Sequence, residues 1–367
     1  MVEEEAALLR MAGHEVTAWE GEATPRRSSV AAGVSAIWSV NAARQVEGLI
    51  DELQPHVVHV HNLYPLLSPA VIVAANRRAV PTVLTLHNYR LMCPSATLLR
   101  DGRTCEACVG RIPWRAVVHR CYRGSAGASA AIALSLAGHR RAGTFDRVTR
   151  FVAVSAFVRR QHVRAGIDER RIIVKPNFAW AAPVRKTDGE YFLYLGRLSP
   201  EKGVDWLPRV WREGALAHPV LVVGDGPELS RLRRSAPSSF VCVGNKAPEE
   251  VAELLTNARA LLVPSLSYEG SPRTIVEAYA AGVPVLANRV GAIPEFVEHG
   301  VTGFLADVRH SASWLSGVQA MLDAETNRRC GERAHARWAA EYSPAQNVRR
   351  LEDVYGCAIA AAEAAAA

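Results

Sequence analysis

The chain has 367 residues, 49% hydrophobic and 22% charged, which is the composition of a globular protein and excludes a fibrous or largely disordered one. Its longest uncharged stretches, 28–43 and 124–138, are rich in Ala, Ser and Gly and do not resemble a membrane span of about 20 apolar residues. The net charge is +7, and the acidic start, Met1-Val-Glu-Glu-Glu5, does not resemble a signal peptide, so we expect a cytoplasmic location.

The first half of the chain alternates between helical and extended patterns. Helices are predicted over 3–11, 36–53, 68–77, 129–141 and 155–165, and strands over 14–19, 56–61, 82–86, 150–154 and 172–175. A stretch that opens at Pro176-Asn-Phe178 and ends near Asp188-Gly189 is the candidate linker.

The alternation restarts after this linker. Strands are predicted over 191–195, 220–223, 240–243, 260–263 and 285–287, and helices over 204–212, 228–234, 248–256 and 272–281. Strands that alternate with helices predict parallel sheets covered on both faces, so we expect two Rossmann-like α/β domains with a ligand site at the carboxyl ends of the strands. The predicted domains are 1–178 and 179–345, and 346–367 is a C-terminal helix that could pack on the first domain.

Positive charge is concentrated in the first domain. Residues 100–171 contain fifteen arginines, no lysine and five acidic residues, and so carry ten net positive charges. Such a segment suits phosphates or an acidic membrane surface, and peripheral contact with the inner face of the membrane is one interpretation. The other interpretation is a solvated surface with arginines that bind phosphate. We expect no nucleic acid partner, because no nucleic-acid-binding motif accompanies the charge.

Four of the seven cysteines lie close together in the chain: Cys93, Cys105, Cys108 and Cys121. Four thiolates in so short a segment are candidates for a structural zinc site. A disulfide is less favoured in a cytosolic protein. The other interpretation that remains is a cysteine-rich loop that binds no metal.

The stretch Ser265–Pro284 carries the most chemical information. Gly270 allows close backbone approach, Ser271 is a good N-cap and Pro272 a good first helical residue, so a helix is expected to begin here. The N-terminus of a helix attracts phosphate. Two carboxylates, Glu269 and Glu277, flank this start and could accept hydrogen bonds from sugar hydroxyls.

Arg197 and Lys202 lie in the turn that follows the strand predicted over 191–195. Arginine can bind two phosphate oxygens at once and lysine supplies a point charge. Together they could neutralise a diphosphate leaving group, so that no cofactor is required for catalysis.

These motifs, taken in order, resemble the family-4 retaining glycosyltransferases of GT-B fold. The resemblance rests on Arg197…Lys202 with Glu269-x7-Glu277, and on the segments Leu195-Gly-Arg-Leu, Val223-Gly-Asp-Gly-Pro227 and Gly291-Ala-Ile-Pro-Glu295. His59-Val-His-Asn62 and His87-Asn-Tyr-Arg-Leu-Met-Cys93 are similar to a cysteine-containing subgroup. The resemblance covers nearly the whole chain.

The resemblance implies roles for the donor-binding residues. It implies that Arg197 and Lys202 bind the donor diphosphate and that Glu277 holds the ribose hydroxyls. It further places Gly270, Ser271, Arg273 and Thr274 along the phosphate, and Asn245 and Lys246 near the base.

Two residues are candidates for contact with the reacting sugar. The resemblance implies that Glu269 contacts the transferred sugar and that His87 lies near the reacting centre, whereas His59 and His61 are expected to be structural. Front-side attack, with the leaving phosphate helping to deprotonate the acceptor, is the mechanism usually proposed for such enzymes, and no catalytic base is assigned.

One departure from the family pattern concerns the start of the chain. In the family, a first strand and a Gly-rich loop precede the helix that here begins at Glu3. From the resemblance we therefore expect that roughly twenty residues of the family pattern are missing from this sequence. Loss of a central strand would expose sheet edges.

The sequence therefore predicts a glycosyltransferase that moves a sugar from a nucleoside diphosphate sugar to an acceptor hydroxyl with retention. The acceptor expected is a glycan or lipid-linked molecule of cell-envelope or exopolysaccharide synthesis. Two alternatives stay open: a non-catalytic nucleotide-sugar-binding subunit, and a nucleotide-sugar epimerase or phosphorylase on the same fold.

Overall fold

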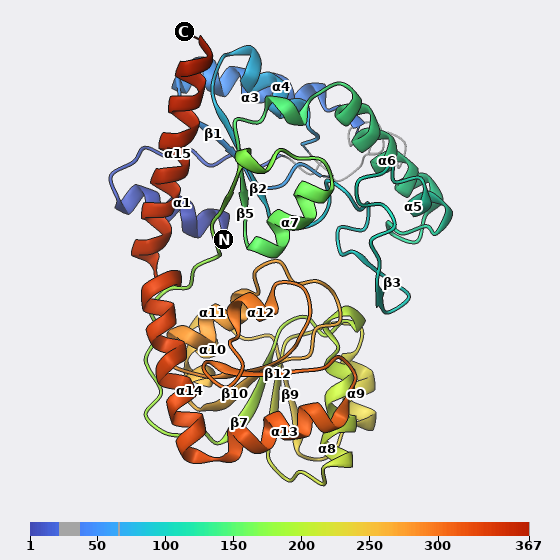
Figure 1. The fold of residues 1–367 in the computed structure, drawn as a ribbon, viewed down its shortest axis with the longest axis vertical. Coiled ribbons are helices and arrows are strands. Elements are labelled where there is room, and N and C mark those ends of the chain that lie inside the picture. Colours follow the sequence, from blue (N-terminus) through green and yellow to red (C-terminus); the bar gives the residue numbers. More distant parts are fainter. Residues whose placement is uncertain (22–36, 65–66, 367) are drawn as a thin grey trace. The chain divides into compact units, whose positions relative to one another are not determined.

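The computed structural model describes residues 1–21, 37–64 and 67–366 (Figure 1). The chain divides into two compact units. Unit 1 comprises Met1–Arg100, Cys105–Pro176 and Val348–Ala367, and unit 2 comprises Asp101–Thr104 and Asn177–Asn347.

Unit 1 is built on a parallel sheet. Its strands are β1 (Val58–Val60), β2 (Thr82–Leu86), β5 (Arg150–Ala153) and β6 (Ile172–Val174), which lie in the order β1-β2-β5-β6. Its helices are α1 (Val2–Met11), α3 (Val40–Leu53), α4 (Ala70–Arg77), α5 (Arg115–Val118), α6 (Ala126–Arg141), α7 (Ala156–Arg164) and the end of α15 (Pro344–Ala366), with 3₁₀ turns η1 (Phe145–Arg147) and η2 (Glu169–Arg171). Two short strands, β3 (Leu99–Arg100) and β4 (Arg103–Thr104), follow β2 in the chain.

The C-terminal helix contributes to the core of unit 1. Val354 and Ala358 of α15 pack against Val83 of β2 and Val152 of β5, and all four side chains are fully buried. Figure 1 shows α15 running along this sheet. Residues near the end of the chain therefore cover strands that lie some 200 to 270 positions earlier in the sequence.

Unit 2 contains a larger sheet, also parallel throughout. Its strands are β7 (Tyr191–Leu195), β8 (Val220–Val223), β9 (Phe240–Gly244), β10 (Ala258–Val263), β11 (Val285–Asn288) and β12 (Gly303–Ala306), in the order β12-β11-β10-β7-β8-β9. Its helices are α8 (Leu207–Glu213), α9 (Leu229–Ser235), α10 (Pro248–Thr256), α11 (Arg273–Ala280), α12 (Ile293–Phe296), α13 (Ser311–Leu322) and α14 (Ala324–Arg337). Short turns of other helix types are η3 (Pro200–Lys202), η4 (Val204–Trp206) and η5 (Trp338–Tyr342).

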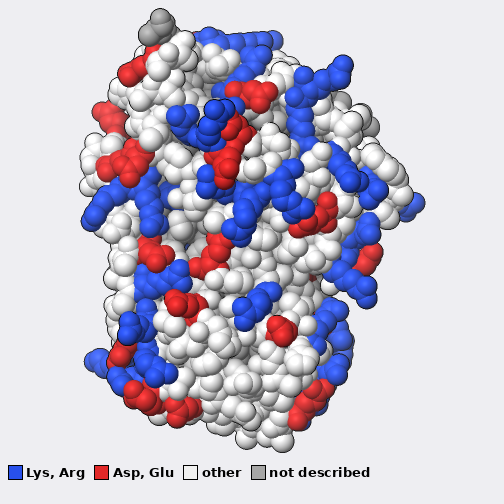
Figure 2. Space-filling view, viewed as in Figure 1, with Lys and Arg blue, Asp and Glu red and all other residues white. Residues whose placement is uncertain are grey.

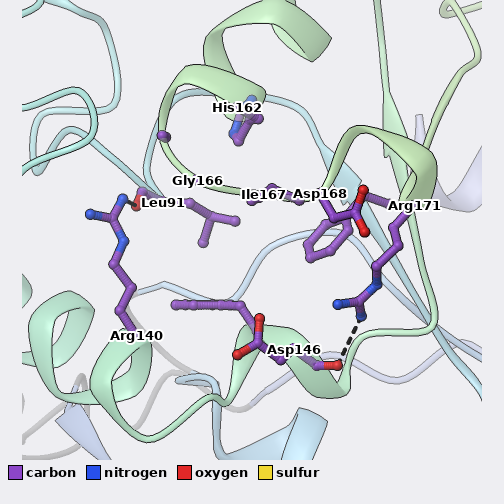
Figure 3. Close-up of a pocket in the computed structure, with 11 residues that line it drawn as sticks. Leu91, Arg140, Asp146, His162, Gly166, Ile167, Asp168 and Arg171 are labelled. Carbon is purple, nitrogen blue, oxygen red and sulfur yellow. Dashed lines mark hydrogen bonds between the residues drawn. The ribbon is translucent and has the colours of Figure 1, made fainter.

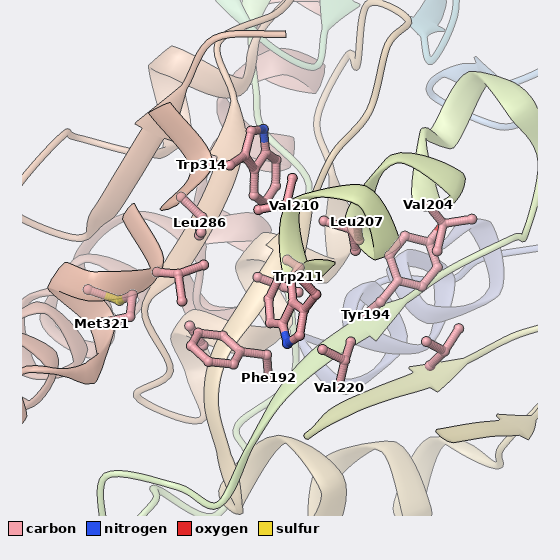
Figure 4. Packing of buried hydrophobic residues seen from close by; sticks show 14 of the residues in the cluster. Phe192, Tyr194, Val204, Leu207, Val210, Trp211, Val220, Leu286, Trp314 and Met321 are labelled. Carbon is pink, nitrogen blue, oxygen red and sulfur yellow. The ribbon is translucent and has the colours of Figure 1, made fainter. Parts of the chain in front are cut away.

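Two tryptophans organise the core of unit 2 (Figure 4). Trp211 of α8 packs edge-on against Phe192 of β7, with ring centroids 5.4 Å apart, and its indole N–H donates to the His218 carbonyl. Trp314 of α13 is fully buried. Large aromatic side chains bury much apolar area, and their N–H groups need partners, which both indoles have.

The predicted fold class is confirmed: both units are α/β with parallel sheets. The strand predicted over 14–19 is wrong, because these residues belong to no strand, and Arg10 binds the Val16 carbonyl instead. The helix predicted over 36–53 begins at Val40, and residue 36 lies outside the described residues. Within the described part of the chain, no helix is long and apolar enough to cross a membrane.

Candidate functional site

The predicted donor-binding residues gather on the loops at one edge of the unit 2 sheet. Arg197 follows β7, Asn245 follows β9, and Glu269 lies in the loop between β10 and α11. Because all six strands are parallel, these loops leave the sheet at the same edge, which is where open α/β sheets bind ligands.

Lys202 and Glu269 form the centre of this arrangement. The Lys202 ammonium donates to Glu269 Oε1 over 2.8 Å, and the Ser265 hydroxyl donates to the same oxygen over 2.6 Å. The Glu269 side chain is 14% exposed and that of Lys202 is 32% exposed. The pair is therefore partly shielded from water while each group remains within reach of a ligand.

Two glycines allow this pair to form. Gly203 has φ +67°, and a Cβ there would lie 2.2 Å from the Pro264 carbonyl oxygen, so only glycine lets the two loops touch. Gly291 has φ +60°, and a Cβ would come within 2.8 Å of the backbone at Tyr268 and Glu269. The loop that carries Glu269 is thus packed between two glycine turns.

Arg197 is more exposed than Lys202. Its guanidinium pairs with Glu201, and its Nε donates to Ser199 over 3.2 Å. Burial raises the pKa of Glu201, but hydrogen bonds from Ser199 and the nearby Arg197 outweigh this, so the pKa lies below its ordinary value. Glu201 is therefore an anion that orients the Arg197 guanidinium. The sequence reasoning missed Glu201.

The start of α11 differs from the prediction in one respect. The helix begins at Arg273 with Pro272 as its N-cap, so the prediction that Ser271 caps the helix is wrong. The Ser271 hydroxyl instead accepts a hydrogen bond from the Asn177 backbone N–H over 3.1 Å, and its carbonyl accepts from the Asn177 amide. The Ser271 hydroxyl is thus hydrogen-bonded to Asn177 and does not cap the helix.

Two further residues of this helix start are partly exposed. Gly270 and Thr274 are neither fully buried nor fully exposed. Arg273, the first residue of α11, donates from Nε over 2.7 Å to Oε1 of Glu277, which lies one turn further along the helix. The Glu277 carboxylate thus has a cationic partner on its own helix.

Asn245 and Lys246 lie on the exposed loop between β9 and α10. The Lys246 ammonium pairs with Glu250 over 2.8 Å, and the same carboxylate accepts from the Ala247 N–H. This arrangement stabilises the start of α10, which is a structural role that the sequence did not reveal.

Asn288 is a further residue that the sequence reasoning missed. Its side chain is fully buried at the end of β11, and its amide donates to the carbonyls of Pro264 and Ser265 over 2.7 and 3.1 Å. Its carbonyl oxygen accepts from the Trp314 indole over 2.9 Å. Asn288 therefore fixes the base of the loop that carries Glu269, and its position at a strand end was the available signal.

In unit 1, His87 lies beside His61. The two rings are joined by a hydrogen bond of 2.9 Å between His61 Nδ1 and His87 Nε2, at the carboxyl ends of β1 and β2. They line a small cavity of about 60 Å³ together with Asn62, Tyr64 and Arg90, among others. His59 is held between the Tyr355 hydroxyl and the Thr85 hydroxyl, at 2.8 and 2.7 Å.

A buried ion pair supports the histidines. Lys175 donates to Glu5 Oε1 over 2.6 Å, and the two side chains are 2% and 5% exposed. Glu5 Oε2 lies 3.9 Å from His61 Nε2. Glu5 from α1 and Lys175 from the end of β6 were not singled out from the sequence, because nothing local relates two residues 170 positions apart.

Burial keeps the histidines neutral. Loss of solvent, together with the neighbouring His61 and Lys175, lowers the pKa of His87 to about 3. Burial also lowers the pKa of His61 and of His59. At neutral pH, the 2.9 Å contact therefore joins two uncharged rings, one as donor and one as acceptor.

A larger cavity of about 270 Å³ lies in unit 1 around α7 and the turn after it (Figure 3). Arg171 and Arg140 line it, but both guanidinium groups donate to backbone carbonyls, of Asp146 and of Leu91. His162 Nδ1 donates to the Val158 carbonyl, and burial lowers its pKa to about 4. None of the predicted site residues lines this cavity.

The four clustered cysteines all belong to unit 1, and none of the four forms a disulfide. Burial raises the pKa of the Cys108 thiol, and the nearby Cys93, Cys105 and Cys121 raise it too, so the four are neighbours. Among the described residues, however, no three His, Cys, Asp or Glu side chains are arranged to hold a metal ion.

Both units are similar to known proteins. Residues 1–179 match the family model described as Glycosyltransferase Family 4, and residues 189–324 match that of Glycosyl transferases group 1. N-acetyl-alpha-D-glucosaminyl L-malate synthase of Bacillus anthracis is 32% identical over 142 residues, which cover 37% of this chain and 36% of the relative. D-inositol 3-phosphate glycosyltransferase of Nocardia farcinica is 32% identical over 243 residues, 57% of this chain and 53% of the relative.

These matches span about half the length or less of the curated relatives. Among solved structures, Anabaena Alr3699/HepE in complex with UDP superposes with a TM-score of 0.65 at 17% identity, covering 86% of this chain and 81% of that one. At this identity the likeness establishes the fold.

Proposed function

Because the chain belongs to the family-4 glycosyltransferases of GT-B fold, we propose that it transfers a sugar from a nucleoside diphosphate sugar to an acceptor hydroxyl with retention of configuration. The contact between Lys202 and Glu269 carries this proposal. An ammonium that can bind phosphate and a carboxylate that can bind sugar hydroxyls lie 2.8 Å apart. A nucleoside diphosphate sugar has both groups next to each other.

The neighbouring ion pairs support the same assignment. We propose that Arg197 exchanges Glu201 for a phosphate oxygen, and that Glu277 accepts from the ribose hydroxyls while it keeps Arg273 as a partner. Arg197 is already oriented by a carboxylate, so the diphosphate replaces one anion with another. Exchange of this kind costs little reorganisation.

For unit 1 we propose that His87 contacts the substrate through Nδ1, because His61 occupies its Nε2. The chemical step breaks the bond between the sugar C1 and the leaving phosphate oxygen and forms a bond from C1 to the acceptor oxygen on the same face. The acceptor proton passes to the leaving phosphate. Lys202 and Arg197 stabilise the charge that develops on this phosphate.

The acceptor class belongs to the same proposal. We propose a glycan or lipid-linked acceptor of cell-envelope or exopolysaccharide synthesis. The excess of arginine in residues 100–171 supports an acceptor that carries phosphate or carboxylate groups.

Transfer from radiolabelled UDP-, GDP- and ADP-sugars to a panel of glycan acceptors tests the proposal. We expect turnover with one nucleotide, an α-linked product from an α-linked donor by NMR, and loss of turnover in Glu269→Gln. Tight donor binding without turnover on any acceptor would favour a non-catalytic binding subunit. Epimerised donor without transfer would favour an epimerase.

We also propose that Cys93, Cys105, Cys108 and Cys121 bind a structural zinc ion. The proposal is supported by the proximity of the four thiols and by the shortage of regular structure between Tyr89 and Gly124. Metal analysis of the protein purified without chelator should find one zinc per chain, and none in Cys105→Ser with Cys108→Ser. An equal metal content in both proteins would contradict it.

A further inference from the structure

Three large apolar side chains project into solvent from one short segment of unit 1. Ile112 is 67% exposed, Trp114 59% and Val118 64%. Isolated exposed apolar residues are common in soluble proteins, but three in seven positions, one of them a tryptophan, form a patch.

The backbone presents these side chains together. The Trp114 N–H donates to the Ile112 carbonyl over 2.9 Å, and the Val118 N–H to the Trp114 carbonyl over 3.4 Å. Trp114 and Val118 are four positions apart across α5, so their side chains lie one above the other on the same helical face. Trp114 and Val118 therefore share one exposed face of the helix, and Ile112 lies two positions before Trp114.

The opposite side of α5 is anchored. Ala116 is 2% exposed, its carbonyl accepts from the Cys121 N–H over 2.9 Å, and its N–H donates to the Pro113 carbonyl over 3.2 Å. Since the segment is held on its inner side, the apolar side chains cannot turn inward to be buried.

The surroundings of this patch are strongly basic. Between Glu106 and Asp146 the chain has six arginines and no acidic residue. Arg111, Arg115, Arg120 and Arg123 are all exposed. In Figure 2, the charged side chains along the margin of unit 1 where Figure 1 draws α5 and α6 are mostly Lys and Arg.

We propose that this α5 surface, formed by Ile112, Trp114, Val118, Arg111, Arg115, Arg120 and Arg123, docks on an anionic lipid bilayer. Tryptophan and aliphatic side chains enter the headgroup region of a membrane, and arginines around them attract acidic lipids. An aqueous polyanion would pair with the arginines but would leave the apolar side chains exposed. A bilayer satisfies both, and the proposal does not depend on the transferase activity.

Co-sedimentation of the full chain with lipid vesicles tests this surface. Vesicles of phosphatidylcholine with phosphatidylglycerol are compared with phosphatidylcholine alone, each at low and high salt. The first variant is Ile112→Ser with Trp114→Ser and Val118→Ser, matched by Met11→Ser with Leu53→Ser, which are exposed apolar residues elsewhere in unit 1. The second is Arg115→Gln, Arg120→Gln and Arg123→Gln, matched by Arg233→Gln, Arg234→Gln and Arg329→Gln, which are exposed in unit 2.

We expect the unaltered chain to bind the acidic vesicles and to be released by salt. Each α5 variant should lower the partition coefficient about tenfold or more, while the matched variants bind as the unaltered chain does. Equal binding to neutral vesicles, or unchanged binding of the serine variant, would overturn the proposal. A concentration-dependent dimer that disappears in the serine variant, with no vesicle binding, would assign the surface to a second copy of the chain instead.

Discussion

Lys202 and Glu269 are 67 positions apart in the chain, yet their side chains meet in a 2.8 Å hydrogen bond at the carboxyl edge of the unit 2 sheet. Lys202 comes from the turn after β7 and Glu269 from the loop after β10, and these two strands are neighbours in the sheet. The contact therefore depends on strand order and on the approach of Gly203 to Pro264.

Lys202→Met should lower nucleoside diphosphate affinity about 10- to 100-fold, because one charge-assisted bond to the diphosphate is lost. Thermal stability should change little, since Lys202 is partly exposed. Arg209→Met is a suitable control, because Arg209 makes a comparable pair with Glu213 on the outer surface of α8. Unchanged affinity in Lys202→Met would remove Lys202 from the donor site.

Asn288→Ala should destabilise unit 2 by about 2 kcal/mol or more. The substitution leaves the Trp314 indole N–H and the Pro264 carbonyl buried without a partner. It should also weaken donor binding, since the loop that carries Glu269 loses its support. Denaturant unfolding of Asn288→Ala beside Asn257→Ala, an exposed asparagine, measures the difference, and equal midpoints for the two would contradict the role of Asn288.

Much of this fold could be predicted from the sequence, because local patterns determine it. The strand Tyr191–Leu195 and the helix Pro248–Thr256 were predicted at their observed bounds. The strand over 14–19 was mispredicted because alternation alone does not supply a neighbouring strand, and Arg10 takes the Val16 carbonyl.

The candidate site could be predicted only in part. Residue types near glycine turns pointed to Arg197, Lys202, Glu269 and Glu277, whose roles still await experiment. The partners of these residues could not be predicted. The hydrogen bond from Ser265 to Glu269, and the support that Asn288 gives to the same loop, result from the packing of strands that are distant in sequence. The capping of α11 was mispredicted because Ser271 has a tertiary partner, Asn177, that no local rule anticipates.

Lys175→Met should destabilise unit 1 by about 3 to 5 kcal/mol, because it leaves the Glu5 carboxylate buried and unpaired. Glu5→Leu combined with Lys175→Met should recover most of this loss, since an apolar pair of similar size carries no desolvation cost. Chemical denaturation of the two single variants and the double variant gives the coupling. A double variant no more stable than Lys175→Met would show that the pair is not the source of the effect.

Stability should fall as the pH is lowered from 7 to 5. The pKa of His87 is about 3 in the folded chain and 6.5 as its ordinary value, so the unfolded chain binds the proton first. The contribution of His87 is complete above pH 6.5 and is lost progressively as the pH falls towards 3. Between pH 7 and 5 this amounts to about 2 kcal/mol.

The variant His87→Gln isolates this contribution from the general effect of acid. Its unfolding free energy should fall less steeply between pH 7 and 5 than that of the unaltered chain. His310→Gln, at an exposed histidine, should keep the original slope. Identical slopes for all three proteins would contradict the buried, neutral state of His87.

The central claim is that unit 2 holds a nucleoside diphosphate sugar at the edge defined by Lys202, Glu269 and Glu277. Titration calorimetry with UDP, GDP and ADP tests it most directly, on the unaltered chain, on Glu277→Ala, and on Glu213→Ala, which removes an equivalent carboxylate from the Arg209 pair on α8. The account predicts micromolar binding of one nucleotide, lost in Glu277→Ala and kept in Glu213→Ala. Absence of binding in a folded sample, or equal binding to Glu277→Ala, would contradict it.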